Sequence, residues 1–129
     1  MKQSEKNNVL KLSNMRKTWI LDMDGTLVVH DGYLYGEDIL LDGVKEFFAK
    51  IHPEDRIVII TARPREYKER TIRFLDDNGL RYDDILFGVP TGERILINDR
   101  KTSGLKTAFA YNKDRNGAFD LDFRIDDSL

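Results

Sequence analysis

Three carboxylates and one threonine stand where apolar segments of the sequence give way to polar ones. They are Asp22, Asp24, Thr61 and Asp99. Residues at the carboxyl ends of neighbouring parallel strands meet at one edge of a sheet, so these side chains are expected to converge. Two carboxylates only two residues apart repel one another unless a cation joins them or one takes a proton. A set of oxygen donors suits a hard cation, and Mg²⁺ is the usual choice because it keeps several waters and also binds phosphate.

Each of these residues alone also fits an ordinary turn, since Asp and Gly are common after strands. Their joint placement at three predicted strand ends favours a site. Gly25, directly after Asp24, leaves the backbone room for close approach of a ligand.

The elements that would position these residues alternate between short apolar runs and amphipathic segments. Strands are predicted over residues 19–21, 57–60, 85–87, 95–97 and 108–111. Helices are predicted over residues 44–51, capped by Asp42, and over residues 65–78, closed by Gly79. An Asp-Gly pair between β-formers predicts a hairpin over residues 28–35. The expected fold is α/β: a three-layer, Rossmann-like parallel sheet with helices on both faces and a small hairpin flap after the first strand.

Composition limits the class of protein. The 129 residues suffice for one domain with its own core, and the absence of cysteine excludes disulfides, thiolate metal sites and a cysteine nucleophile. A net charge of −2 argues against a general nucleic-acid binder. No apolar run exceeds four residues, which argues against a membrane-spanning helix. The polar first residues lack the apolar stretch of a signal peptide, so a cytoplasmic protein is expected.

Three strings of the sequence carry a resemblance to a known family. DMDGTL at residues 22–27 resembles the first motif of the haloacid dehalogenase superfamily of phosphotransferases. IITAR at residues 59–63 is similar to its second motif, and LIND at residues 96–99 to its metal-binding fourth. The first string is highly specific, and the other two are weak alone but stand in the correct order. The resemblance spans about residues 19–112, most of the chain.

The resemblance implies a Mg²⁺-dependent phosphatase. Asp22 would attack the phosphoryl group and form an aspartyl-phosphate, and Asp24 would be general acid to the leaving oxygen and then base to water. The Thr61 hydroxyl would bind a phosphoryl oxygen. Mg²⁺ would be held by Asp22, Asp99 and the backbone carbonyl of Asp24. The residues expected to bind the substrate are Gly25, Thr26, Ala62, Arg63 and Arg65.

The cation of the superfamily's third motif has two candidates. Lys101, directly beyond Asp99, is the first choice, and Arg63 is the second. Arg94 is rejected because, five residues before Asp99 along a strand, it would lie about 16 Å towards the wrong end. A solvated surface charge is the alternative interpretation for both candidates.

The resemblance also bears on domains and substrate. Residues 1–16 are expected to be a polar segment with at most a short helix, residues 17–113 the hydrolase core, and residues 114–129 a tail in which alternating apolar residues favour a short edge strand. No segment is long enough for a cap domain. Tyr33 and Tyr35 in the flap serve either as a lid or as core or interface residues.

Among capless relatives, LINDRK at residues 96–101 resembles small bacterial phosphatases of capsule or surface-polysaccharide precursor synthesis. The expected substrate is a small phosphorylated sugar, polyol or similar metabolite. The expected partners include neither nucleic acid nor membrane, and a homo-oligomer would shield the open site.

Other functions stay open at this stage. A receiver-like signalling module also uses acidic residues, a threonine and a lysine on a parallel sheet, but its phosphorylated Asp follows a different strand. A non-catalytic binding protein of the same fold is a further alternative. A polynucleotide 3′-phosphatase shares the chemistry, but the acidic balance argues against it.

Overall fold

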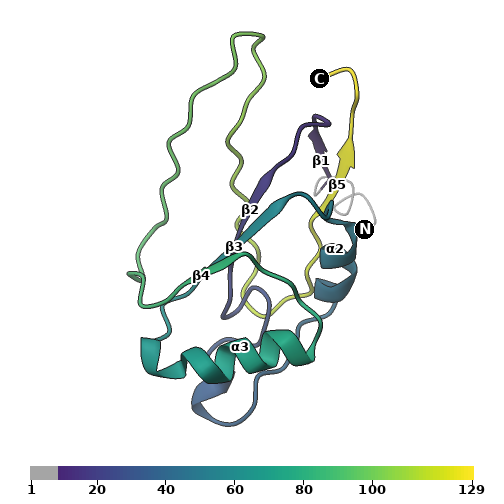
Figure 1. Ribbon diagram of the computed structural model, residues 1–129. Helices are drawn as coiled ribbons and strands as arrows, with labels where there is room; N and C mark the ends of the chain where they lie inside the picture. The colour runs from purple at the N-terminus through teal and green to yellow at the C-terminus, as the bar shows by residue number, and fades with distance from the viewer. Residues whose placement is uncertain (1–8) are drawn as a thin grey trace.

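A three-stranded parallel sheet forms the centre of the computed structural model, which describes residues 9–129 (Figure 1). The strands β2 (Thr18–Asp22), β3 (Arg56–Ile60) and β4 (Asp84–Leu86) lie in the order β2-β3-β4. Their register places Leu21 beside Ile59 and Ile59 beside Ile85. The predicted strands at residues 19–21, 57–60 and 85–87 are therefore confirmed to within a residue or two at each end.

Two helices pack beside this sheet. The helix α2 (Val44–Lys50) begins after Gly43, and the 3-10 helix η2 (Arg65–Tyr67) leads directly into α3 (Lys68–Asp77). Both predicted helices are present. Gly79 adopts a φ of +68°, the left-handed conformation that ends a helix, as predicted. The cap of α2 differs from the prediction, because Gly43 and not Asp42 occupies that position.

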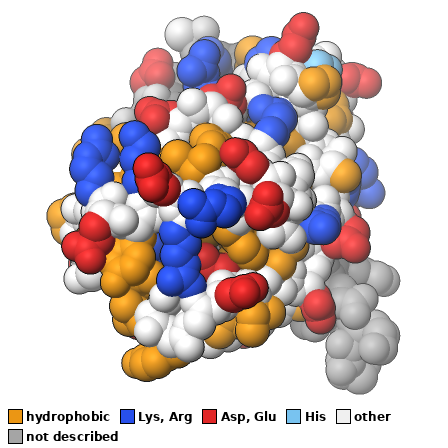
Figure 2. Space-filling view, turned by 60° about the horizontal axis from the view of Figure 1, so that its bottom comes forward, with side chains coloured by type: hydrophobic (Ala, Val, Ile, Leu, Met, Phe, Trp, Pro, Cys, Tyr) orange, Lys and Arg blue, Asp and Glu red, His pale blue; other side chains and the backbone are white. Residues whose placement is uncertain are grey.

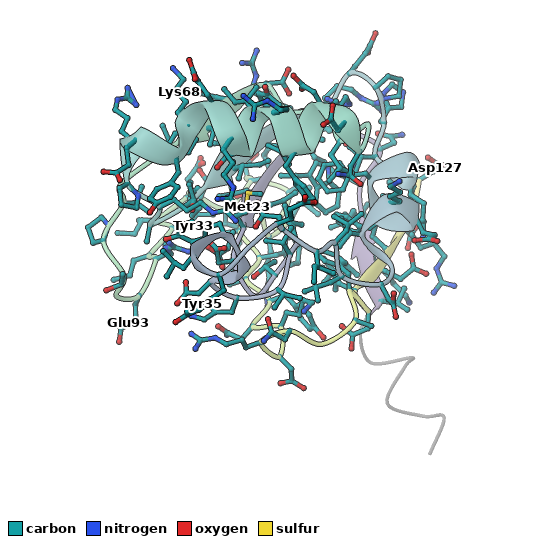
Figure 3. All side chains as sticks on the ribbon, turned by 90° about the horizontal axis from the view of Figure 1, so that it is seen from below. Met23, Tyr33, Tyr35, Lys68, Glu93 and Asp127 are labelled. Carbon is teal, nitrogen blue, oxygen red and sulfur yellow. The ribbon has the colours of Figure 1, made fainter. Side chains whose placement is uncertain are left out.

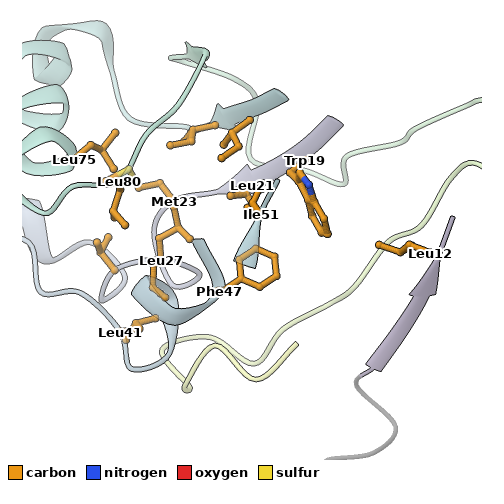
Figure 4. Close-up of a cluster of buried hydrophobic side chains, with 14 residues drawn as sticks. Leu12, Trp19, Leu21, Met23, Leu27, Leu41, Phe47, Ile51, Leu75 and Leu80 are labelled. Atoms are coloured by element: carbon orange, nitrogen blue, oxygen red, sulfur yellow. The ribbon is translucent and has the colours of Figure 1, made fainter. Parts of the chain in front are cut away.

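The hydrophobic core lies on one face of the sheet (Figure 4). Side chains alternate along a strand, so Trp19 and Leu21 of β2 are buried whereas Ile20 between them is 50% exposed. Phe47 of α2 and Leu75 of α3 pack into the same cluster. The described residues thus form a small α/β fold with parallel strands, and the opposite face of β2 is partly open.

The two ends of the described chain pair with each other. The strands β1 (Val9–Leu12) and β5 (Asp122–Ile125) form a separate parallel two-stranded sheet. Phe123 of β5 packs against Trp19, with ring centroids 4.9 Å apart. The edge strand predicted near the C-terminus is confirmed. The prediction of at most a short helix near the N-terminus is wrong for residues 9–12, and residues 1–8 lie outside the described residues.

The flap after β2 differs from the predicted hairpin. Residues 27–29 approach residues 39–41, through the bridge between Val28 and Leu40 and the hydrogen bond from the Val29 N–H to the Ile39 carbonyl. The 3-10 helix η1 (Gly32–Leu34) fills the space between these two segments. The Asp-Gly pair does turn the chain, since Asp31 has a φ of +56°, but it leads into η1 and not into a returning strand. We call residues 28–41 the flap.

The predicted strands at residues 95–97 and 108–111 are wrong for this structure. Residues 90–112, here called the arm, contain no strand and extend away from the sheet as a long loop (Figure 1). Ile95 is 81% exposed and Ile97 is 89% exposed. The apolar pattern satisfies the requirement for a strand, but a strand also needs a partner, and the described chain provides none for these residues.

The longest helix among the described residues, α3, has ten residues. No helix in this part of the chain combines the length and the hydrophobicity needed to cross a membrane.

Candidate functional site

Asp22 is the last residue of β2, and its carboxylate forms an ion pair and accepts a hydrogen bond from a hydroxyl. Arg94 Nη1 lies 2.9 Å from Asp22 Oδ1, and Thr26 Oγ1 donates to Asp22 Oδ2 at 3.0 Å. The Asp22 side chain is 35% exposed. A carboxylate held in this way is oriented and still open to a ligand, which is what a nucleophile requires.

Arg94 is the cation that faces Asp22, although sequence reasoning rejected it. The rejection assumed that residues 95–97 form a strand parallel to β2, which would place Arg94 at the far end of that strand. Because the structure has no strand there, the chain is free to bring Arg94 back to Asp22. The position of Arg94, one residue before an apolar run, gave no signal of this contact.

A buried arginine holds Asp24, the second carboxylate of the pair. Arg63 donates from Nε to Asp24 Oδ2 at 3.0 Å and from Nη2 to Asp24 Oδ1 at 2.9 Å. The same guanidinium donates from Nη2 to Asp38 Oδ1 at 2.6 Å and from Nη1 to Asp38 Oδ2 at 3.1 Å. Its remaining donor reaches Thr71 Oγ1 of α3 at 2.9 Å. All five N–H groups of Arg63 therefore have acceptors.

The Arg63 network connects the flap to the end of β2. Asp38 lies in the flap, and the ring of Tyr33 in η1 stacks 4.2 Å from the guanidinium carbon. Burial acts to lower the pKa of Arg63, but the hydrogen bonds and charges of Asp24 and Asp38 outweigh it, and the pKa is raised above its usual value. The guanidinium therefore stays charged and fixes Asp24 relative to the flap.

The burial of Arg63 changes the role that the sequence predicted for it. Its side chain has no solvent exposure, so the interpretation as a solvated surface charge is wrong. With every N–H bonded to protein, Arg63 has no donor left for a phosphate in this arrangement. Ala62 and Arg65, the neighbouring residues predicted to bind the substrate, are both exposed. Their role at the substrate stays a prediction.

Thr61 follows β3 and is fully buried. Its Oγ1 accepts the backbone N–H of Arg63 at 3.1 Å, and its own N–H donates to the Leu86 carbonyl at 2.9 Å. The side chain thus fixes the turn that directs Arg63 inwards. The predicted contact between Thr61 and a phosphoryl oxygen stays a prediction.

The loop after Asp24 packs against the C-terminal segment. Gly25 has a φ of +84°, which only glycine adopts easily, and a side chain there would meet Arg115 Cγ at 3.1 Å. The Gly25 carbonyl accepts the Asn116 N–H at 2.9 Å and Lys113 Nζ at 3.3 Å. Burial lowers the pKa of Lys113, although nearby carboxylates act to raise it. Lys113 is thus a second cation beside the Asp24–Gly25 loop that sequence reasoning missed.

Asp99 and Lys101, the other two residues predicted for the site, lie in the arm. The Asp99 carbonyl accepts the Thr107 hydroxyl, and the Lys101 N–H donates to the Leu105 carbonyl at 3.0 Å. These contacts close the turn at the tip of the arm, which Figure 1 shows well away from the sheet. Among the described residues, the ion pair with Asp22 is made by Arg94, and none is found between Asp22 and Lys101.

The predicted magnesium site can be tested against this arrangement. The sequence places three carboxylates at the site, but no group of three or more acidic or histidine side chains in the described part of the chain is close enough to hold a metal ion. Asp22 and Asp24 are present at the end of β2, whereas Asp99 is not brought to them. The donors of one chain, as arranged here, therefore do not form the complete predicted site.

One face of the molecule carries both signs of charge. Figure 2 shows basic and acidic side chains interspersed on one face of the molecule, with hydrophobic side chains exposed between them. In Figure 3, Tyr33 lies against the interior, whereas Tyr35 and Glu93 lie at the periphery on the same side of the molecule. Burial, followed by the charge of Asp24, raises the pKa of Tyr33. Tyr33 is thus a packing residue of the flap, and Tyr35 is 88% exposed.

No protein-family model, no curated protein and no solved structure matches the chain.

Proposed function

We propose that this chain hydrolyses phosphomonoesters through an aspartyl-phosphate on Asp22, in the manner of a capless phosphatase of the haloacid dehalogenase superfamily. The proposal includes the finer fold, a Rossmann-like core with a flap and without a cap domain. It also includes a cytoplasmic location and a small phosphorylated sugar, polyol or related metabolite as substrate, both expected from the sequence.

The pairing at the end of β2 supports this proposal most strongly. Asp22 is accessible and faces the cation of Arg94, while Asp24, two residues on, is fixed by a buried guanidinium. An anionic nucleophile that attacks a phosphate dianion needs positive charge beside it, and Arg94 supplies one such charge.

The proposed reaction has two steps. In the first, a carboxylate oxygen of Asp22 bonds to phosphorus while the bond from phosphorus to the ester oxygen breaks, and Asp24, which enters the step with a proton taken up from solvent, gives that proton to the leaving oxygen. In the second, water attacks phosphorus, the bond to Asp22 breaks, and Asp24 takes the proton of the water. Both Asp24 oxygens accept hydrogen bonds from Arg63, so the proton uses a remaining lone pair.

Magnesium stays in the proposal as the cofactor predicted from the sequence. The arrangement within one chain brings two of the three predicted carboxylates to the end of β2, so the steps above are assigned to side chains alone.

A substrate panel tests the proposal. Phosphate release is measured from phosphorylated sugars and polyols, with Mg²⁺ and with a chelator, for the natural chain and for Asp22→Asn. The variant is expected to lose turnover by about 10³-fold or more while keeping its circular dichroism spectrum. The control is Asp42→Asn, at an exposed carboxylate that directly follows the flap in the sequence, and this variant should retain activity.

Three outcomes contradict the proposal. Release of phosphate by Asp22→Asn at the natural rate would show that another residue is the nucleophile. Stable phosphorylation of the natural chain without any release would identify a phospho-accepting module of the receiver-like kind, and no reaction with any donor would identify a binding protein.

A further inference from the structure

The arm exposes apolar side chains and unpaired backbone along most of its length. Residues 91–104 are all exposed, including Ile95, Leu96 and Ile97 in succession. Among the described residues, the arm's backbone groups make two hydrogen bonds to one another, both in the turn at Lys101–Leu105, and none to the rest of the chain. An extended apolar segment with free N–H and C=O groups is a strand without a partner.

The three-stranded sheet has a free edge that could accept such a strand. The order β2-β3-β4 leaves β2 at an edge, so one side of its backbone has no strand of residues 9–129 beside it. On the open face, Ile20 is half exposed and Leu86 nearly so. A free edge of a sheet accepts an added strand readily. The arm lacks a strand to pair with, and the free edge of β2 can pair with one.

The ion pair of Arg94 opposes closure of the arm onto its own β2. A strand parallel to β2 must begin beside Thr18 and end beside Asp22, roughly 13 Å further on. Arg94, however, holds the root of the arm at Asp22, the end where such a strand should finish. The segment that follows leaves the sheet, as Figure 1 shows. Parallel pairing of the arm with β2 of its own chain would therefore require the ion pair to break.

We propose that the arm of a second copy of this chain pairs with the edge of β2, and that two copies exchange arms about a twofold axis. Residues 95–99 of one copy then run beside Thr18–Asp22 of the other, so that residue 97 lies beside Ile20 and Asp99 beside Asp22. Each copy keeps its own Arg94–Asp22 pair. A C2 pair satisfies both arms and both edges at once, because every copy carries one of each.

This exchange would complete the site of the proposed function, on which this part of the inference rests. Asp99 arrives from the second copy as the third carboxylate, at the end of β2 where one chain supplies only Asp22 and Asp24. Arg100 and Lys101 follow Asp99 in the arm and bring positive charge towards those acids. Opposite charge on arm and edge favours this occupant over a partner of unknown sequence.

A crosslinking experiment tests the exchange without reference to activity. The chain has no cysteine, so each introduced thiol is unique. Ile20→Cys and Ile97→Cys variants are mixed, oxidised and analysed by mass spectrometry, and the result expected is a disulfide between residue 20 of one chain and residue 97 of another. Ile39→Cys, at an exposed isoleucine in the flap, replaces Ile20→Cys as the control and should give no such bond. Light scattering of the natural chain is expected to give the mass of a dimer.

A complementation experiment then tests the shared site. Asp22→Asn and Asp99→Asn variants are each expected to be inactive, whereas their mixture regains roughly a quarter of the natural activity. Half of the randomly formed dimers are mixed, and each mixed dimer has one intact site of two.

The outcomes separate the two proposals. A monomer by light scattering, or no disulfide between residue 20 and residue 97 in the mixed variants, overturns the exchange whatever the activity. Dimers without complementation, in an active natural enzyme, overturn the shared site. An inactive natural enzyme that gives the interchain disulfide leaves the exchange standing and removes the proposed function.

Discussion

Removal of one carboxylate from the Arg63 network should strongly destabilise the protein. Asp38 accepts two of the five hydrogen bonds of a guanidinium with no solvent exposure, and its own side chain is 1% exposed. Asp38→Asn keeps the shape but removes the charge and turns one acceptor into a donor that faces the guanidinium. Breaking one half of a buried ion pair costs about 3–5 kcal/mol. Because Asn retains one acceptor, a loss of about 3 kcal/mol is expected.

Urea unfolding followed by the fluorescence of the single tryptophan, Trp19, measures this loss. Trp19 is buried and donates to Asp55 Oδ2 at 3.0 Å, so its emission reports the packed core. A loss of 3 kcal/mol lowers the urea midpoint by about 1–3 M. Glu37→Gln, at the exposed carboxylate one residue earlier, is the control and should change stability by less than about 0.5 kcal/mol. Equal midpoints for the two variants would refute the argument that Asp38 balances the buried charge.

Three further predictions concern other features of the structure. Gly43→Ala should cost about 2 kcal/mol or more, because φ is +89° and the added Cβ would lie 2.5 Å from a backbone carbonyl, whereas Gly36→Ala meets no atom within 4 Å. Tyr33→Phe should reduce the loss of stability that the protein suffers above about pH 10. Because the pKa of Tyr33 is raised on folding, the neutral phenol stabilises the folded protein below the unfolded pKa of 10.0, and this stabilisation is lost as the pH rises through the folded pKa. Tyr35→Phe, at an exposed ring, is the control. Arg94→Gln should lower phosphatase activity by about 10²-fold while changing stability by less than about 1 kcal/mol.

Each of these predictions has a direct check. Urea midpoints compare the two glycine variants, and equal values would show that the tight approach at residue 43 relaxes without cost. Unfolding at about pH 9 and about pH 11 compares the two tyrosine variants, and an identical fall in both would remove Tyr33 from the effect. Steady-state kinetics of Arg94→Gln at the natural rate would contradict the pairing of that arginine with the nucleophile.

The sequence predicted the central elements well because their signals are local. The run Ile57–Ile60 and the segment before Asp22 are short and β-branched or aromatic, and each ends in turn residues. Gly79 closes α3 for a reason that three or four neighbouring residues already contain. The placement of Asp22 and Asp24 at the end of β2 was predictable for the same reason, because Asp22 directly follows an apolar run and Asp24 stands two residues later.

The parts that were missed depend on distant contacts. Residues 95–97 have the composition of a strand, yet a strand also needs a neighbour, and composition does not say which chain provides it. Asp38 stands in a polar stretch with no periodicity, so nothing marked it as the buried partner of an arginine 25 residues later. The pairing of β1 with β5 joins residues more than 100 positions apart in weakly apolar segments. The sequence predicts Arg63 as a substrate-binding residue, or else as a solvated surface charge, because its burial depends on Asp24 and Asp38, which lie far from it in the chain.

The most direct test of the central claim is a search for phosphate on Asp22 itself. The natural chain and Asp22→Asn are mixed with a reactive phosphomonoester, quenched in acid within a turnover, digested with pepsin at low pH to preserve the acyl phosphate, and analysed by mass spectrometry. The peptide of interest is the one that contains Asp22, the candidate nucleophile. We expect this peptide to gain the mass of one phosphoryl group, located by fragmentation at Asp22, and the variant to gain none. Phosphate located on another residue, or phosphate release with an unmodified peptide at every time of quenching, would contradict the claim.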